Sequence, residues 1–230
     1  MKWEDNLNVF NYENYNTINW NGMRLYQTPM GELPSITTVL GHTEPPEKKA
    51  TLVAWQNALG PIKSAEVSKK ATDHGTNVHL LAERFLKGEQ VDAPINGKHV
   101  PGIDLGAFNS LKLKLKLISP IWGQEESVYS ESLLVAGRFD CAGLYKNVPS
   151  IIDFKTSLNR LKNKEEITSY ALQLAFYAQA HNELFDTDIR QGVILLAGAG
   201  GMPQEFIFNT LDFLEELVIR VDKFMNDTFL

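Results

Sequence analysis

The sequence predicts an α/β fold in which a mixed β-sheet is flanked by helices and follows an N-terminal helical region. Two observations carry this prediction. Short segments rich in Val, Ile, Leu, Phe and Tyr gather in the second half of the chain, as is typical of strands. Segments with the periodicity of amphipathic helices precede, separate and follow them. This order of elements indicates one sheet that is covered by helices.

One domain is expected, because 230 residues with 43% hydrophobic content can bury a single sizeable core. We divide it into an N-terminal, mainly helical part, residues 1–118, and a part with the sheet core and the C-terminal helices, residues 119–230. The formal net charge of −6 argues against a protein that coats nucleic acid non-specifically. It does not argue against an enzyme that acts on nucleic acid.

The sequence also indicates in which cellular compartment the protein is expected. No stretch approaches the apolar length that spans a bilayer, and residues 1–16 resemble neither a secretory signal nor an Arg-rich transit peptide. The single cysteine, Cys141, excludes a disulfide within the chain and a cysteine-ligated zinc or iron–sulfur site. We therefore expect a cytoplasmic protein with no membrane partner and no iron–sulfur cluster.

The N-terminal half reads mainly as helix. Residues 1–33 look irregular, apart from a hairpin expected near Met23–Gln27. Ser35 has the side chain of an N-cap and precedes a short apolar segment. Helical periodicity then runs from Lys48 to about Lys87, with an interruption expected near Asp73–Gly75. The glycines and prolines of Lys87–Asp104 predict a loop.

The segment from Leu105 to Leu117 fits two patterns. Its leucines and lysines alternate as in a strand, but its apolar residues also form a helical stripe, and its length favours the helix. The remaining elements are expected in this order: strands Ser127–Tyr129, Leu133–Tyr145 and Ser150–Lys155, helix Glu165–Asn182, strands Gln191–Ala197 and Glu205–Phe208, and helix Thr210–Phe229 with Asn209 or Thr210 as its N-cap.

Two acidic residues stand in apolar strand segments on either side of a tight turn. Antiparallel pairing around a turn near Lys146–Asn147 places Asp140 opposite Asp153. Lys155 lies two residues after Asp153 and therefore on the same face of its strand. Carboxylates this close repel unless a proton or a cation lies between them, and oxygen ligands suit Mg²⁺ or Mn²⁺.

A divalent ion held by these acids can polarise a phosphodiester and activate a water molecule. The lysine can orient or deprotonate that water, or stabilise the negative charge that develops on the pentavalent phosphorus. The alternative is a surface ion pair in which Lys155 only neutralises Asp153. The apolar residues that flank both acids favour the catalytic interpretation.

Four motifs, taken in order, resemble the PD-(D/E)XK nucleases of the RecB-like exonuclease branch, above all phage-type and mitochondrial genome maintenance exonucleases. The central one combines Gly137–Asp140 with Ile151–Ser157. The others are Gly75-x-x-x-His79-x-x-x-Glu83, Gln173-x-x-x-Tyr177 and Pro34–Leu40. The resemblance covers about residues 34–180. It implies a restriction-endonuclease-like core, with Asp140, Asp153 and Lys155 as catalytic residues.

The resemblance also implies roles for further residues. The implied metal ligands are Asp140, Asp153, the Phe154 carbonyl, His79 and Glu125, with Glu126 as the alternative to Glu125. The residues implied to bind DNA or support the site are Gln173, Tyr177, Thr156, Ser157, Glu83 and Arg160. Structural roles compete with these assignments: a core position for the histidine, packing on the sheet for the tyrosines, capping of a strand end for the hydroxyls, and a solvated face for the charges.

The function expected from this resemblance is a DNA exonuclease with one or two Mg²⁺ or Mn²⁺ ions, acting in phage-type recombination, repair or degradation in the cytoplasm of a bacterium or a phage-infected host. Its partners would be single- or double-stranded DNA with a free end and a single-strand-binding or recombination protein, with the oligomeric state left open. ATP is not expected, because the chain has no phosphate-binding loop motif. The alternatives are a restriction-type or structure-specific endonuclease and a catalytically inert module that binds DNA or protein.

Overall fold

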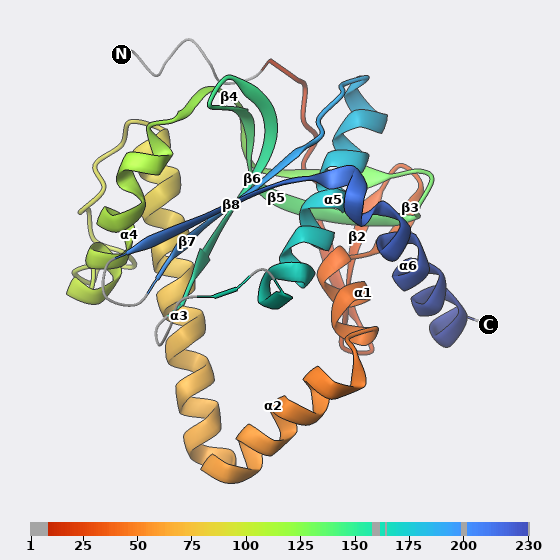
Figure 1. Cartoon of the computed structure of the whole chain (residues 1–230), viewed down its shortest axis with the longest axis horizontal. Coiled ribbons are helices and arrows are strands. Elements are labelled where there is room, and N and C mark those ends of the chain that lie inside the picture. Colours follow the sequence, from red (N-terminus) through yellow and green to blue (C-terminus); the bar gives the residue numbers. More distant parts are fainter. Residues whose placement is uncertain (1–8, 158–161, 164, 199–201, 230) are drawn as a thin grey trace.

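The computed structural model describes residues 9–157, 162–163, 165–198 and 202–229. Within them, the centre is a five-stranded sheet of order β4-β5-β6-β7-β8, in which β6 and β7 are parallel and the other neighbours antiparallel. Its strands are β4 Ile118–Ser130, β5 Val135–Tyr145, β6 Val148–Thr156, β7 Gln191–Ala197 and β8 Pro203–Asn209. Helices lie on both faces (Figure 1), so the predicted mixed α/β class is confirmed.

The two faces of the sheet bury separate apolar cores. One core contains side chains of α1, α5 and α6, and the other contains side chains of α3 and α4. The helices are α1 Ile36–His42, α2 Pro46–Leu59, α3 Pro61–Leu86, α4 Gly102–Leu115, α5 Thr168–Phe185 and α6 Leu214–Phe229. None of the described helices combines the length and the apolar character that crossing a membrane requires.

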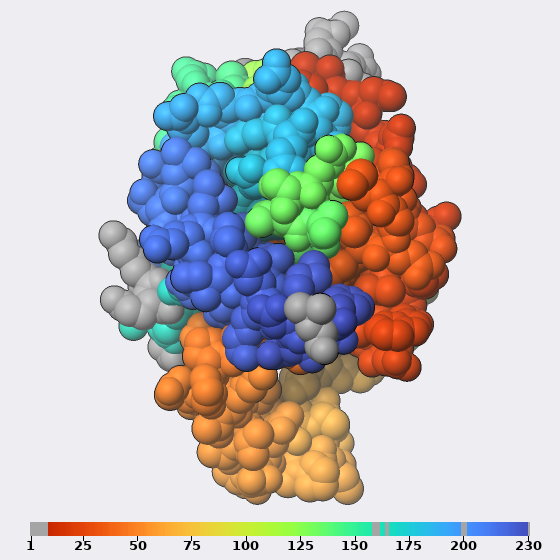
Figure 2. All heavy atoms as spheres, turned by 90° about the vertical axis from the view of Figure 1, so that its right-hand side faces the viewer, coloured from red at the N-terminus to blue at the C-terminus, as the bar shows by residue number. Residues whose placement is uncertain are grey.

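Helix α2 and the first half of α3 project from this body as an arch (Figures 1 and 2). No residue of α2 is buried. The two helices meet at Gly60, whose φ of 78° interrupts the helical path, and Pro61 begins α3. The interruption predicted near Asp73–Gly75 is wrong, because α3 continues through it. Gly75 lies where α3 passes close to the sheet, since a Cβ there would meet Thr156 Oγ1 at 3.5 Å.

Both ends of the arch are fastened to the body. On the α1 side, the buried Arg220 of α6 donates to Leu40 O at 2.9 Å and to Thr43 Oγ1 at 2.7 Å. On the α3 side, the buried carboxylate of Asp104 lies 2.5 Å from His74 Nδ1 and accepts from Asn77 at 2.6 Å. The first pair of contacts joins α6 to the end of α1, and the second pair joins α3 to α4.

The N-terminal part contains a small sheet in addition to its helices. Strands β1 Thr17–Trp20, β2 Met23–Thr28 and β3 Gly31–Pro34 form an antiparallel meander. The hairpin predicted near Met23–Gln27 is part of it, and residues 17–34 are more regular than predicted. Most of β1 is exposed, so its sequence lacks the apolar alternation that marks a half-buried strand. Ser35 caps α1 as predicted, because its Oγ accepts from Thr38 N.

The hairpin of β5 and β6 has the predicted register. The turn residues Lys146 and Asn147 have φ of 52° and 65°, as in the two-residue turns that suit antiparallel strands. Cys141 pairs with Ile152, and the next positions along this register are Asp140 and Asp153.

The remaining elements differ from prediction mainly at their ends. Leu105–Leu117 is helical up to Leu115, as favoured above, with Phe108, Leu111 and Leu115 buried on one stripe. Strand β4 begins at Ile118, nine residues before the predicted Ser127, and passes Pro120 and Gly123 through two irregularities in its pairing with β5. Asn209 caps the short 3₁₀ turn Thr210–Phe213 that leads into α6.

Candidate metal centre and active site

The facing of side chains along β5 changes at Asp140. Val135 and Phe139 pack into the core on the α5 side, whereas Cys141 and Tyr145 pack into the core on the α3 side. In a regular strand these four odd-numbered residues would share one face. The alternation of side chains therefore shifts by one between Phe139 and Cys141.

The partner strand is distorted at the same level. Glu125 lies between the pairs Gln124–Cys141 and Glu126–Phe139, opposite Asp140, and its φ is 54°. A left-handed conformation at a residue other than glycine costs on the order of 1 kcal/mol or more and is concentrated at functional sites. The distortion directs the carboxyl groups of Glu125 and Asp140 toward α3.

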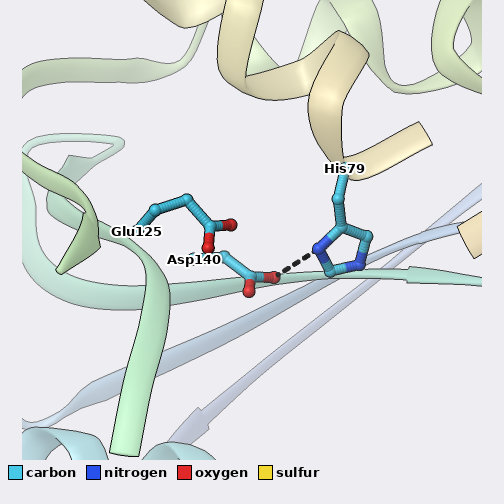
Figure 3. Close-up of side chains that lie close together, drawn as sticks. All are labelled: His79, Glu125 and Asp140. Atoms are coloured by element: carbon cyan, nitrogen blue, oxygen red, sulfur yellow. Dashed lines mark ion pairs between the residues drawn. The ribbon is translucent and has the colours of Figure 1, made fainter. Parts of the chain in front are cut away.

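Three side chains converge there. Ligand atoms of His79, Glu125 and Asp140 all lie within 4.8 Å of one another. Figure 3 shows the imidazole of His79 reaching from α3 toward the sheet, with its Nδ1 3.3 Å from Asp140 Oδ2 and with Glu125 beside them. Asp140 Oδ2 also accepts from the backbone N–H of Phe154 at 2.7 Å. One imidazole and two carboxylates are thus close enough together to serve as ligands of one metal ion.

Asp153 and Lys155 form the adjoining pair on β6. Lys155 Nζ lies 2.8 Å from Oδ1 and 2.7 Å from Oδ2 of Asp153. Only the contact with Oδ1 has hydrogen-bond geometry, so the buried Oδ2 accepts no hydrogen bond among the described residues. Its partner among the described residues is the charge of Lys155, and it retains the capacity to bind a cation. Asp153 is 1% exposed, which makes it the most buried acid of the site.

The charges of the site are strongly coupled. Burial opposes charge on His79, but the nearby Asp140 carboxylate outweighs it and raises the pKa of the imidazole to about 9. Burial likewise opposes charge on Asp140, yet His79 lowers its pKa. Burial raises the pKa of Asp153, an effect that Lys155 offsets only in part. Burial and the negative Asp140 raise the pKa of Glu125 to about 7. A bound cation would relieve this crowding of acids.

Helix α5 supplies polar side chains beside this pair. The Tyr170 ring lies 5.0 Å from Lys155 Nζ and 5.8 Å from Lys162 Nζ, within the range of cation–π contacts. One turn later, Gln173 Nε2 donates to Tyr177 Oη at 2.9 Å. Tyr177 is buried, so its ring packs on the sheet while Gln173 shares the lining of the adjacent cleft.

A cleft of about 730 Å³ opens in front of the metal-ligating side chains. Its walls come from β1 and β2, the beginning of α1, the second half of α3, and β4, β5 and α5. The predicted site residues that line it are His79, Glu83, Glu125, Asp140, Gln173 and Tyr177.

The other predicted site residues take different positions. Glu83 lies in the cleft but contacts Lys87 at 2.5 Å rather than His79. Glu126 is outside the cluster that Glu125 joins, which favours Glu125 of the two. Ser157 donates its backbone N–H to Ala197 O at 2.9 Å, as expected for a residue that ends a strand. Arg160 lies outside the described residues.

Two arginines of the cleft were missed by sequence analysis. Arg138 lies 3.2 Å from Glu125 Oε2, and Arg24 donates to Thr37 Oγ1 at 2.6 Å. Both line the cleft and offer positive charge beside the acids. Arg138 is within the motif Gly137–Asp140 and was therefore detectable. Arg24 is on β2, and no local pattern indicates that this strand forms a wall of the site.

Comparison with known proteins bears on this arrangement. No protein-family model matches the chain. Mitochondrial genome maintenance exonuclease 1 of Mus musculus is 27% identical over 177 residues, which are 74% of this chain and 51% of the mouse protein. The chain is therefore similar in sequence to a protein that is named as an exonuclease. The protein of the same name from Xenopus tropicalis is 25% identical over 84% of this chain and 58% of its own length. The one from Homo sapiens is 25% identical over 74% of this chain and 51% of its own length.

The predicted resemblance to a PD-(D/E)XK-like exonuclease is thereby confirmed, whereas the phage-type branch stays a prediction. The chain spans about half the length of the curated relatives that it matches. Among solved structures, a protein from Eubacterium rectale covers 70% of this chain, and 69% of its own, at 16% identity and a TM-score of 0.45. At that TM-score the likeness supports neither fold nor function.

Proposed function

We propose that this chain is a metal-dependent DNA exonuclease, which hydrolyses phosphodiester bonds starting from a free end. The observation that carries the proposal is the convergence of His79, Glu125 and Asp140 beside the Asp153–Lys155 pair. Three curated relatives bear the name of an exonuclease, which supports the same reaction class.

The residues present fit a divalent cation. Carboxylate oxygens and one imidazole suit Mg²⁺ or Mn²⁺, and the nitrogen ligand favours Mn²⁺ more than Mg²⁺. The buried Asp153 Oδ2, with no hydrogen bond among the described residues, is an oxygen that such an ion would satisfy. His79, Glu125, Asp140 and Asp153 would hold it, and the Phe154 carbonyl is the further ligand we propose. When bound, the cation supplies Lewis acidity to the scissile phosphate and lowers the pKa of a water.

Lys155 carries positive charge to the reacting phosphate. Burial opposes the charge on Nζ, but Asp153 and Asp140 raise the pKa of the ammonium group. A lysine held in its charged form stabilises negative charge on the phosphate and orients water by donating hydrogen bonds, and it is a poor base. Asp153 fixes the direction of Nζ on one side, and the Tyr170 ring lies against it on another.

The arch supports the requirement for a free end. The cleft lies between the beginning of α1 and the second half of α3, and α2 bridges the outer ends of these two helices (Figure 1). A linear strand can enter such a bridged site by its end, whereas a closed circle has no end to offer.

The test is degradation of linear single- and double-stranded DNA beside closed circles of both kinds, with Mg²⁺, Mn²⁺ or EDTA. We expect loss of linear DNA only, abolished by EDTA. Cutting of the circles would replace the proposal with an endonuclease. Intact DNA with either metal would leave a module that binds DNA or protein without cutting it.

We also propose a place in phage-type recombination, repair or degradation of DNA, acting in the cytoplasm. The resemblance of Gly137–Asp140 and Ile151–Ser157 to phage-type enzymes supports it. Expression of the active protein in bacteria should shorten the survival of injected linear DNA, compared with the Asp153→Asn variant. Equal survival would contradict this role.

A further inference from the structure

A second, smaller hollow adjoins the catalytic cleft. Its volume is about 210 Å³, and Tyr15 and Ser127 line both spaces. Along β4, Ser127 is two residues and Tyr129 four residues beyond Glu125, which corresponds to roughly 7 and 13 Å of strand. The hollow thus adjoins the cleft, on the side away from the metal-ligating side chains and toward Tyr129.

Three aromatic side chains contribute to the walls of this hollow. Tyr15 and Tyr129 stand edge to face, with 5.6 Å between their ring centroids. Phe185 forms another side, and its ring is held by Tyr12 at 4.9 Å and His181 at 4.9 Å. Aromatic surfaces that are already fixed by neighbours bind a flat ring at little cost in conformational entropy.

The polar side chains at the rim select against a phosphate. Asn11 and Glu13 line the hollow together with Ser127, and they bring a carboxylate but no positive charge. Glu13 repels a phosphate group, whereas it accepts hydrogen bonds from an amino group on a base edge, as does the amide oxygen of Asn11. The occupant that fits is therefore uncharged, flat and able to donate hydrogen bonds.

We propose that this hollow is a nucleobase subsite, which binds one base of the same DNA strand whose phosphodiester lies in the catalytic cleft. The inference rests on the proposed nuclease function, because the hollow adjoins the cleft where that function places the DNA strand. Tyr15 presents its ring to the base, and the edge-to-face contact with Tyr129 positions that ring. Binding one base at a defined distance from the metal centre would hold the strand in register during cleavage.

The test scans a single abasic position along a single-stranded oligonucleotide. Binding is measured by calorimetry with Ca²⁺ in place of Mg²⁺, under conditions where a gel shows the oligonucleotide intact. For the wild-type protein we expect about tenfold weaker binding when one particular position is abasic, in keeping with the strength of base–aromatic stacking. Other positions should change the affinity much less.

Variants at Tyr15 then connect that position with the hollow. Tyr15→Leu keeps an apolar side chain but removes the ring, so it should weaken binding about tenfold and become insensitive to the abasic position. Tyr15→Phe should retain wild-type affinity and the same position dependence. Trp20→Leu is the matched control, because Trp20 is an exposed aromatic residue on β1 and lines neither space.

The outcomes separate the two proposals. Suppose that the protein digests DNA with Mg²⁺. The subsite is then overturned, and the nuclease retained, if no abasic position weakens binding more than the others, or if Tyr15→Leu keeps the position dependence of the wild type. Suppose instead that the protein never cuts DNA. If Tyr15→Leu still abolishes the position dependence of binding, the subsite is supported and the nuclease is overturned. A thermal melt of Tyr15→Leu that matches the wild type shows that the effect is local.

Discussion

The two walls of the metal centre are built in different ways. On the sheet side, Asp140, Asp153 and Lys155 belong to one hairpin, and their spacing follows from its two-residue turn and register. On the helical side, His79 comes from the half of α3 that follows the arch, where His74 contacts Asp104 of α4. The sheet wall is a local structure, whereas the helical wall depends on packing between distant segments.

This difference indicates that the two walls of the metal centre contribute differently to catalysis and to metal binding. The hairpin supplies the buried acids and the lysine, which must keep fixed distances for chemistry. Helix α3 supplies a more exposed ligand, since the side chain of His79 is 27% exposed and that of Asp153 is 2% exposed. Changes on the hairpin should therefore abolish turnover, and changes on α3 should mainly weaken metal binding.

The largest effect is expected for Asp153→Asn. Loss of the carboxylate removes a metal ligand and the partner of Lys155, so the cleavage rate should fall on the order of 10³-fold or more. The fold should persist, because the change also removes repulsion with Asp140. Digestion of linear DNA and a thermal melt measure both, with Asp188→Asn, an exposed acid outside the site, as the control. An unfolded Asp153→Asn protein would instead indicate a structural role.

Lys155→Ala should have the next largest effect. Removing one charged donor to the reacting phosphate typically costs about 10²–10³ in rate. Metal binding should survive, because the ligands of the cation are untouched, and calorimetry with Mn²⁺ tests this directly. Unchanged turnover would remove Lys155 from the mechanism.

His79→Ala should act on the metal rather than on the chemistry. We expect the Mn²⁺ concentration for half-maximal activity to rise about tenfold, with a smaller change in rate at saturating metal. His99→Ala, an exposed histidine away from the site, should leave the titration unchanged. A rate loss that saturating metal does not restore would place the helical wall in the chemical step as well.

The pH dependence of metal binding tests the contribution of Glu125 to the metal centre. The pKa of Glu125 is raised from 4.5 to about 7, so its proton stabilises the metal-free protein at low pH and that stabilisation is lost as pH rises through 7. A metal ion competes with this proton, and the increase in Tm on adding Mn²⁺ should therefore grow severalfold between pH 5 and 7.5. Glu125→Gln should reduce this growth without abolishing it, because the pKa values of His79 and Asp153 are raised as well, while Glu126→Gln should preserve it.

The smallest effect is expected in the arch itself. Leu52 of α2 is 53% exposed, so Leu52→Ala should change the free energy of unfolding by less than about 0.5 kcal/mol. Leu174 of α5 is fully buried, and Leu174→Ala should cost about 2–5 kcal/mol. Denaturant titration of both variants measures the contrast. A large loss for Leu52→Ala would indicate that another surface covers the arch.

The sequence by itself determined the hairpin and most of the secondary structure. The turn residues and the apolar flanks of Asp140 and Asp153 are local signals, and a two-residue turn leaves one register, so the facing of the two acids followed without tertiary information. The pattern of α4 and the N-caps Ser35 and Asn209 were local as well.

Only the tertiary structure decided the rest of the site. It kept α3 helical through Gly75, where the helix passes close to Thr156 of the sheet. It brought Arg24 of β2 and Tyr15, which precedes β1, to the cleft, and no local pattern in the sequence indicates that these two residues line it. It also turned Glu125 toward His79 through a left-handed backbone conformation, which a sequence does not display at a residue other than glycine. These side chains are far apart in sequence, and tertiary packing, rather than the conformational preferences of each local segment, brings them together.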